Sequence, residues 1–223
     1  MKKIKVLHIQ FHSDLKQNEI ELFRGAVLSK MDDASVLFHN HTVDNYRYSY
    51  PLIQYKRIYK KASILCLEEG TEAIGQFFSS GDFNFRLGER AVKMEVNFLK
   101  AHQYLVQIWD SMFVYRIYRW LPLNETNYQE YKKLDGIVEQ CAFLEKKLIG
   151  NILSFAKGIN LCLDKEIICK ILQIEDPYVV SYKGTKMMTF NICFKTNISL
   201  PNYIGLGKGV SIGNGIVMRE VKK

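Results

Sequence analysis

The feature that most constrains this chain of 223 residues is a glycine-rich segment near its C-terminus, Gly205 to Gly215. It reads Gly-Leu-Gly-Lys-Gly-Val-Ser-Ile-Gly-Asn-Gly and holds five of the chain's 14 glycines, so its backbone can adopt positive φ angles or lie close to a bulky group. Successive N–H groups without side chains form an anion-binding nest, and a lysine adds positive charge. We therefore predict phosphate binding by Gly205, Gly207, Lys208, Gly209, Gly213 and Gly215. The alternative is a flexible hairpin tip before a last strand over 216–221.

Charge and composition favour a globular protein with a polyanionic partner. Hydrophobic residues make up 48% of the chain, and 31 Lys and Arg against 23 Asp and Glu give a net charge of +8. Acidic residues are missing from 45–67 and from 177–219, so the basic excess is concentrated in two blocks, one of which contains the glycine-rich segment. A basic excess of this kind suits nucleic acid.

The cysteines and the hydropathy pattern indicate a cellular compartment. The five cysteines are odd in number and lack Cys-x-x-Cys spacing, which is typical of reduced thiols. No run of 18 apolar residues is present, and polar residues interrupt the N-terminus, so neither a membrane span nor a signal peptide is expected. We predict a cytoplasmic protein without a membrane partner.

The first half of the chain has the periodicity of a ferredoxin-like domain. Residues 3–11 alternate as a strand does, and apolar residues from Ile20 to Met31 recur at helical spacing after Asn18. The expected order β-α-β-β-α-β is completed by an extended segment over 46–59, a strand over 62–67, a helix over 71–78, and strands over 83–87 and 92–98. We predict an N-terminal ferredoxin-like domain over residues 1–100.

The second half repeats this pattern incompletely. An extended segment over 104–121 precedes a long helical pattern that starts at a cap at Thr126 and ends at Gly158. Strands are expected over 167–174, 178–182 and 187–196, but no room is left for a second helix. The predicted fold class is therefore α+β, with two tandem ferredoxin-like (RRM-like) domains, of which the C-terminal one, over 101–223, is irregular and ends in the glycine-rich loop.

The sequence Phe38-His39-Asn40-His41 is the strongest candidate for a catalytic site. In a continuing strand, His39 and His41 project from the same face, and two imidazoles can serve as base and acid near neutral pH. On RNA, the base would activate a ribose 2′-OH for attack on the adjacent phosphorus, leaving a 2′,3′-cyclic phosphate and a 5′-OH. The alternative is that both histidines make structural hydrogen bonds beside a turn.

Residues 46–61 surround this candidate with tyrosines and basic residues and contain no acid. Tyrosines can stack on bases while cations hold the phosphate backbone, so we predict RNA contacts by Arg47, Tyr48, Arg57 and Lys60. Lys56 or Arg57 could neutralise the charge that builds on the phosphorane, and Tyr46 is a further catalytic candidate. An amphipathic edge strand would have the same alternation.

A metal site is the competing interpretation of the histidine pair. A His-x-His at a strand end can hold a metal with Asp44 as a partner. We disfavour this interpretation because no further cluster of histidines or carboxylates completes the site. The sequence therefore predicts neither a metal nor another cofactor.

The glycine-rich segment and four further motifs along the chain resemble those of a known protein family. The spacing of Gly205, Gly207, Gly213 and Gly215 is similar to the signature of the CRISPR-associated endoribonucleases that cut repeat RNA, within the RAMP superfamily. The likeness to their b-type branch extends over Phe23-Arg24-Gly25-Ala26, Phe38-His39-Asn40-His41, Tyr50-Pro51-Leu52-Ile53-Gln54-Tyr55-Lys56 and Trp120-Leu121-Pro122-Leu123-Asn124. It implies two RNA-binding ferredoxin-like domains and metal-independent cleavage of CRISPR precursor RNA within each repeat.

The resemblance also implies roles and partners. The general base would be His41 or His39, and Lys56, Tyr46 or Tyr48 would match the lysine or tyrosine that some relatives add. CRISPR repeat RNA is the expected partner, and a homodimer is left open. A non-catalytic RNA-binding subunit of a CRISPR effector complex is the alternative function.

Overall fold

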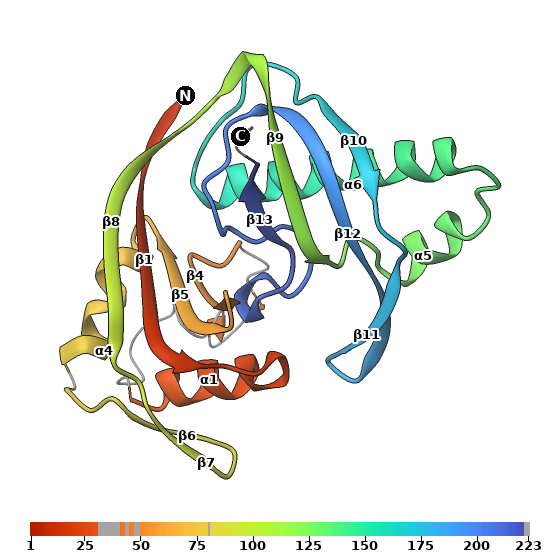
Figure 1. Ribbon diagram of the computed structural model, residues 1–223. Coiled ribbons are helices and arrows are strands. Elements are labelled where there is room, and N and C mark those ends of the chain that lie inside the picture. The colour runs from red at the N-terminus through yellow and green to blue at the C-terminus, as the bar shows by residue number, and fades with distance from the viewer. Residues whose placement is uncertain (31–40, 43–44, 47–49, 80, 221–223) are drawn as a thin grey trace. The chain divides into compact units, whose positions relative to one another are not determined.

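The computed structural model describes residues 1–30, 41–42, 45–46, 50–79 and 81–220 (Figure 1). It divides into two compact units. The N-terminal unit consists of Lys3–Tyr104 and a short return of the chain, Ser211–Gly213. The C-terminal unit consists of Met1–Lys2, Leu105–Val210 and the chain from Asn214 on.

The N-terminal unit has a four-stranded sheet in the order β4-β5-β1-β8. Its strands are β1 (Lys2–Asp14), β4 (Ile53–Ile58), β5 (Lys61–Leu67) and β8 (Val96–Val106). Strand β5 pairs antiparallel with both β1 and β4. The helical segments among the described residues of this unit are η1 (Gln17–Glu19), α1 (Ile20–Leu28), α3 (Gly70–Ala73) and α4 (Gly75–Ser79). This is the predicted ferredoxin-like order of elements.

One apolar core joins the helices to one face of this sheet. Phe11 of β1, Phe23 of α1 and Phe77 of α4 are all fully buried in it. The rings of Phe11 and Phe23 meet edge to face at 5.9 Å between centroids. Leu7, Ile9 and Phe11 of β1 all belong to this core. Because side chains alternate along a strand, the residues between them, His8 and Gln10, belong to the other face of the sheet.

Two details of this unit differ from the sequence prediction. The single helix expected over 71–78 is divided into α3 and α4. The strand expected over 92–98 is also divided, because β6 (Asn84–Leu87) and β7 (Arg90–Lys93) form a hairpin and β8 begins only at Val96. The hairpin turns at Gly88, whose φ of 65° is readily adopted by glycine. A further short pair, β2 (His41–Thr42) and β3 (Asn45–Tyr46), carries two of the candidate residues.

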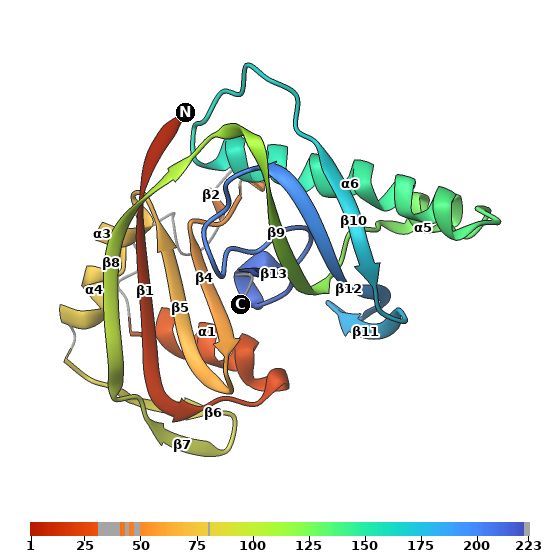
Figure 2. The same ribbon diagram turned by 45° about the horizontal axis from the view of Figure 1, so that its top comes forward.

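The C-terminal unit repeats the same strand order with one helix replaced. Its sheet runs β10-β12-β9-β13, with β11 paired to β12. The strands are β9 (Ile108–Trp120), β10 (Cys169–Ile174), β11 (Tyr178–Tyr182), β12 (Thr185–Ile198) and β13 (Ile216–Arg219). Helix α5 (Glu125–Tyr131) precedes α6 (Ile137–Gly158), which lies along one face of the sheet (Figure 2). Where a second helix would follow β12, the chain forms the glycine-rich loop with one turn of 3-10 helix, η2 (Val210–Ile212).

The predicted start of the long helix is wrong in detail. The N-cap of α5 is Asn124, whose side-chain oxygen accepts a hydrogen bond from the backbone N–H of Asn127 at 2.7 Å, so Thr126 lies inside the helix. The helical pattern is also divided, because α6 starts anew after Gly136. No helix among the described residues is long and apolar enough to cross a membrane. Two sheet-rich units of mixed helix and strand confirm the predicted α+β class.

Candidate functional site

The structure pairs the backbones of two predicted catalytic residues. In the two-residue ladder of β2 and β3, His41 is directly opposite Tyr46. His39, Arg47 and Tyr48 lie outside the described residues. The pairing brings the backbones of His41 and Tyr46 together, although four residues separate them in the sequence.

Lys56 is the predicted catalytic residue whose surroundings are best defined. It lies in the middle of β4, and its side chain is fully buried. Its Nζ atom has no hydrogen-bond partner within the described part of the chain. Burial lowers the pKa of this ammonium group from 10.5 to about 7, because removal from water disfavours the charged form. Lys56 can therefore exchange a proton near neutral pH, but it cannot touch a solvent-borne ligand in this conformation.

The glycine-rich loop meets β4 at this lysine. Ser211–Gly213 belong to the N-terminal unit, and a Cβ atom added at Gly213 would lie 3.5 Å from the Cα of Lys56. The same atom would lie 3.3 Å from the backbone oxygen of Tyr55. Gly213 and Lys56 were predicted as site residues from opposite ends of the sequence, and the structure brings them together.

A row of buried polar residues extends from Lys56 across the second face of the sheet. Lys56 is opposite Ser63 on β5, and Ser63 is opposite Gln10 on β1. The Nδ2 atom of Asn97 donates a hydrogen bond to Oε1 of Gln10 at 3.1 Å. Neither Gln10 nor Ser63 was predicted from the sequence, although the polar positions of β1, which alternate with Leu7, Ile9 and Phe11, were a visible signal.

His8 lies on β1 near Gln10, and its surroundings favour the neutral imidazole. It is 8% exposed, and its ring contacts that of Phe98 edge to face. Burial, together with the charges of Lys56, His102 and Lys100, lowers its pKa from 6.5 to about 4. His8 is therefore neutral at physiological pH.

The predicted RNA-binding segment after residue 46 is less uniform than its sequence suggests. Arg57 is half-buried, and its Nε donates a hydrogen bond to the backbone oxygen of Leu15 at 2.6 Å. Lys60 is exposed in the turn between β4 and β5. The interpretation that all the tyrosines here stack on bases is wrong for Tyr55, which is 1% exposed and packs against Phe23 in the core.

The glycines of the C-terminal loop are required by the packing of the loop itself. Gly207 has a φ of 90°, and a Cβ atom there would lie 2.9 Å from the backbone oxygen of Leu121. Gly215 has a φ of 66°, and its Cβ would clash with the backbone oxygen of Leu206. No L side chain fits these positions without strain. The absence of side chains at Gly207 and Gly215 is therefore accounted for without a ligand.

Part of the predicted anion nest is occupied by the protein's own carbonyls. The N–H of Lys208 donates to the backbone oxygen of Leu121 at 3.1 Å, and that of Gly215 to Arg119 at 2.9 Å. The Lys208 side chain is exposed. Phosphate binding by this loop stays a prediction, and its exposed charge comes from Lys208.

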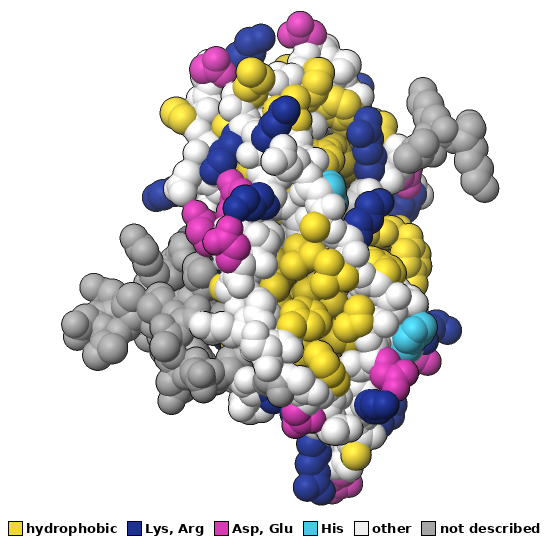
Figure 3. Space-filling view, turned by 90° about the vertical axis from the view of Figure 1, so that its left-hand side faces the viewer, with side chains coloured by type: hydrophobic (Ala, Val, Ile, Leu, Met, Phe, Trp, Pro, Cys, Tyr) yellow, Lys and Arg dark blue, Asp and Glu magenta, His cyan; other side chains and the backbone are white. Residues whose placement is uncertain are grey.

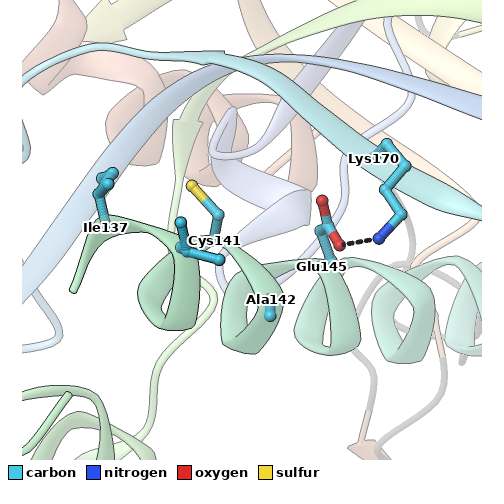
Figure 4. A pocket seen from close by; sticks show the side chains of 6 residues that line it. Ile137, Cys141, Ala142, Glu145 and Lys170 are labelled. Atoms are coloured by element: carbon cyan, nitrogen blue, oxygen red, sulfur yellow. Dashed lines mark hydrogen bonds and ion pairs between the residues drawn. The ribbon is translucent and has the colours of Figure 1, made fainter. Parts of the chain in front are cut away.

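A shallow pocket of about 270 Å³ lies elsewhere in the C-terminal unit, between the start of α6 and β10 (Figure 4). Its polar residues are Glu145 and Lys170, which form an ion pair at 2.9 Å. Glu145 also accepts the backbone N–H of Ile171 at 2.9 Å. The remaining lining is mainly apolar, and none of the predicted site residues is in it. The two charged groups of the pocket are therefore paired with each other, and burial raises the pKa of its one thiol, that of Cys141, which disfavours the reactive thiolate.

The side of the molecule along which β8 runs has a mixed surface (Figure 3). Hydrophobic side chains gather there, with acidic and basic side chains around them. On β8 itself Val96, Phe98 and Leu99 are exposed. The exposed residues of β8 are therefore partly apolar, unlike the basic lining of a nucleic-acid groove.

A metal centre finds no support in the described residues. No group of three or more His, Cys, Asp or Glu side chains within residues 1–30, 50–79 and 81–220 could hold a metal ion. The metal interpretation requires His39 and Asp44, which lie outside the described residues. It is therefore tested by cleavage in the presence of a chelator.

The sequence and the fold both match one family. Residues 2–104 match the family described as the Cas6b N-terminal domain, and residues 107–220 match the family described as the Cas6b C-terminal domain. An uncharacterized protein of Methanocaldococcus jannaschii, MJ0978, is 42% identical over 111 residues, which cover 49% of this chain and 74% of that protein.

Two solved structures are similar over almost the entire chain. A crystal structure of Cas6b superposes with a TM-score of 0.90 at 26% identity, covering 98% of this chain and all of that one. A structure described as the CRISPR RNA processing endoribonuclease Cas6b superposes with a TM-score of 0.77 at 25% identity and the same coverage. These matches confirm the family resemblance seen in the sequence. The chain belongs to the Cas6b family.

Proposed function

We propose that this protein is an endoribonuclease that cleaves CRISPR precursor RNA within its repeats without a metal ion. The observation that carries the proposal is the Cas6b family match over both units, which include His41 and the glycine-rich loop. RNA provides its own nucleophile in the ribose 2′-OH, so the protein needs a base, an acid and stabilisation of the phosphorane.

The roles fall to residues of the N-terminal unit. One of His39 and His41 removes the proton of the 2′-OH, and the oxygen attacks the adjacent phosphorus. The other histidine, in its protonated form, donates a proton to the departing 5′-oxygen. The products are a 2′,3′-cyclic phosphate and a 5′-OH. Tyr46, whose strand pairs with that of His41, orients the reacting groups.

Lys56 has an electrostatic role in this proposal. Its buried ammonium has no partner to neutralise it among the described residues, and a charge in a low-dielectric setting acts more strongly than one in water. Protonated Lys56 therefore stabilises negative charge that develops on the phosphorane. Its packing against Gly213 connects this charge to the glycine-rich loop.

The remaining predicted residues bind the RNA backbone. Lys208 and Lys60 are exposed and can pair with phosphates. Arg47, Tyr48 and Arg57 are assigned contacts with the RNA backbone or bases on their sequence positions. Binding by several such cations would weaken steeply with added salt.

The decisive experiment incubates the protein with repeat RNA in excess EDTA and analyses the 3′ ends. We expect cleavage to persist and to leave a 2′,3′-cyclic phosphate. A 3′-OH product would contradict the mechanism, and loss of cleavage on chelation would favour the metal interpretation.

The histidine roles are tested separately. His39→Ala and His41→Ala should each lower the cleavage rate by roughly 10²- to 10⁴-fold, as loss of a general acid or base does. His12→Ala is the matched control, because His12 is an exposed histidine on β1. Equal cleavage rates of the wild type and a variant with both His39→Ala and His41→Ala would refute the proposed roles. Tight RNA binding without cleavage by the wild type would favour the alternative, a non-catalytic subunit of a CRISPR effector complex.

A further inference from the structure

Arg119 is a residue that the preceding assignment does not use, and its backbone is strained. It lies near the end of β9 with a φ of 52°, in the left-handed region that side chains other than glycine, asparagine and aspartate rarely adopt. The register between β9 and β12 shifts here, from Ile117 opposite Ile192 to Trp120 opposite Phe190. The chain therefore has a β-bulge at this point, a feature that redirects a side chain and is common beside functional sites.

The surrounding residues hold Arg119 in this conformation from both sides. Its N–H donates to Oδ1 of Asn191 at 2.9 Å, and its carbonyl accepts the N–H of Gly215 at 2.9 Å. Asn191 is itself fixed, because its Nδ2 donates to Glu175 at 2.9 Å. Glu175 is in turn paired with Arg116 at 3.3 Å. A strained residue persists only when its neighbours determine its position in this way.

The guanidinium of Arg119 has hydrogen-bonding capacity that the described chain leaves unused. Its Nε is fully buried and has no hydrogen-bond partner within the described residues. The side chain as a whole is half-buried. Guanidinium groups have five N–H donors and no acceptor, and buried donors are almost always paired. Arg116, three residues earlier, shows the usual situation, since it is paired with two glutamates. The buried Nε is closed to a ligand, so the groups of this half-buried side chain that a ligand can use are the terminal N–H donors of the guanidinium.

The position of Arg119 indicates the kind of ligand. Its backbone is bonded to Gly215 of the glycine-rich loop, and Leu121, two residues on, accepts the N–H of Lys208. Both cations therefore belong to the same junction between β9 and the loop. Arginine forms bidentate hydrogen bonds with phosphate. No acidic residue occurs from 177 to 219, so the loop and both strands that flank it up to Arg219 contribute no negative charge to this junction.

We propose that Arg119 binds a phosphate of the RNA backbone, and that the bulge in β9 serves to present its guanidinium beside the glycine-rich loop. This inference rests on the proposed function, because it takes the ligand to be RNA.

The test uses Arg119→Gly, since glycine adopts a φ of 52° without strain and lacks only the side chain. The probe is the repeat RNA that the wild type cleaves, with a 2′-deoxy nucleotide at the mapped cleavage position, or the unmodified repeat if the wild type only binds. Arg119→Gly should bind about tenfold or more weakly, as expected for loss of a charge-assisted phosphate contact. The slope of log K against log salt should fall by about 0.7, the value for one phosphate contact on a single strand.

Two further variants are controls, one for the loss of any positive charge and one for the geometry of the guanidinium. Lys133→Gln removes an exposed positive charge after α5, outside the junction, and should bind within about twofold of the wild type. Arg119→Lys keeps the charge but loses bidentate geometry, so its affinity should lie between those of the wild type and Arg119→Gly.

The outcomes are distinct. Unchanged affinity and salt slope in Arg119→Gly, with the wild type binding RNA, would overturn the role of Arg119 and leave the proposed function intact. A lower melting temperature of Arg119→Gly, with a loss of binding no larger than its unfolded fraction, would show that Arg119 serves folding alone. Failure of the wild type to bind repeat RNA would overturn both proposals.

Discussion

Replacing Lys56 by methionine should stabilise the protein at neutral pH. Methionine has a similar length and no charge, and the Nζ that it removes makes no hydrogen bond within the described residues. Lys56 is fully buried, and its pKa falls from 10.5 to about 7 because its charged form is desolvated. The substitution therefore removes an unfavourable charge and leaves no polar group without its partner.

The pKa shift sets the magnitude of this effect. At 1.36 kcal/mol per pKa unit, a fall from 10.5 to about 7 corresponds to about 5 kcal/mol, the upper limit of the gain. The folded-state pKa is the lower one, so the unfolded chain binds more protons between about pH 7 and 10.5. Wild-type stability should therefore rise with pH across this window. The gain from Lys56→Met is largest at or below pH 7 and disappears by about pH 10.5.

Urea unfolding followed by circular dichroism, at about pH 7 and about pH 9, measures the difference. The stability gap between Lys56→Met and the wild type should shrink by about 2 kcal/mol between these values. Lys3→Met is the control, because Lys3 is exposed and its loss removes no buried charge. A gap that does not change with pH, or a variant less stable than the wild type at pH 7, would refute the reasoning.

Three other predictions follow from the packing. Gly215→Ala should destabilise the protein by more than about 1 kcal/mol in thermal unfolding, because Gly215 has a φ of 66° and an added Cβ would clash with Leu206. Gly25→Ala in α1 should instead stabilise it by about 0.5–1 kcal/mol, because a Cβ there has nothing within 4 Å. Equal effects of the two substitutions would contradict the packing argument. The lowered pKa of His8, about 4, means that stability is lost as pH falls from 6.5 through 4, and His8→Phe should weaken this acid sensitivity in urea titrations; an unchanged pH profile would count against it. If the exposed edge strand β8 forms a homodimer, Leu99→Lys should convert it to monomer in analytical ultracentrifugation, and a wild type that is monomeric at all concentrations would exclude that dimer.

Local patterns in the sequence were sufficient to predict the fold class. Alternation in β1 and the helical spacing of Ile20, Phe23 and Val27 depend only on neighbouring residues, and the structure has both elements. The missing second helix of the C-terminal unit was also visible, because too few residues lie between β12 and β13. The family resemblance came from motifs, and the comparisons confirm it.

The environment of individual side chains could not be predicted in the same way. Lys56 and Tyr55 are adjacent in a strand that looks amphipathic, yet both are buried, because the burial of a strand depends on what covers each face. The contact of Gly213 with Lys56 joins residues far apart in the sequence, which no local spacing encodes.

The sequence by itself determined the order of the elements, the basic blocks and the candidate histidines, since these are properties of residue type and periodicity. Only the tertiary structure decided that the loop glycines are needed for packing, that Lys56 is buried without a hydrogen-bond partner among the described residues, and that Arg119 occupies a strained bulge. The physical reason is that burial, pKa and backbone strain depend on contacts between segments that fold together from distant parts of the chain.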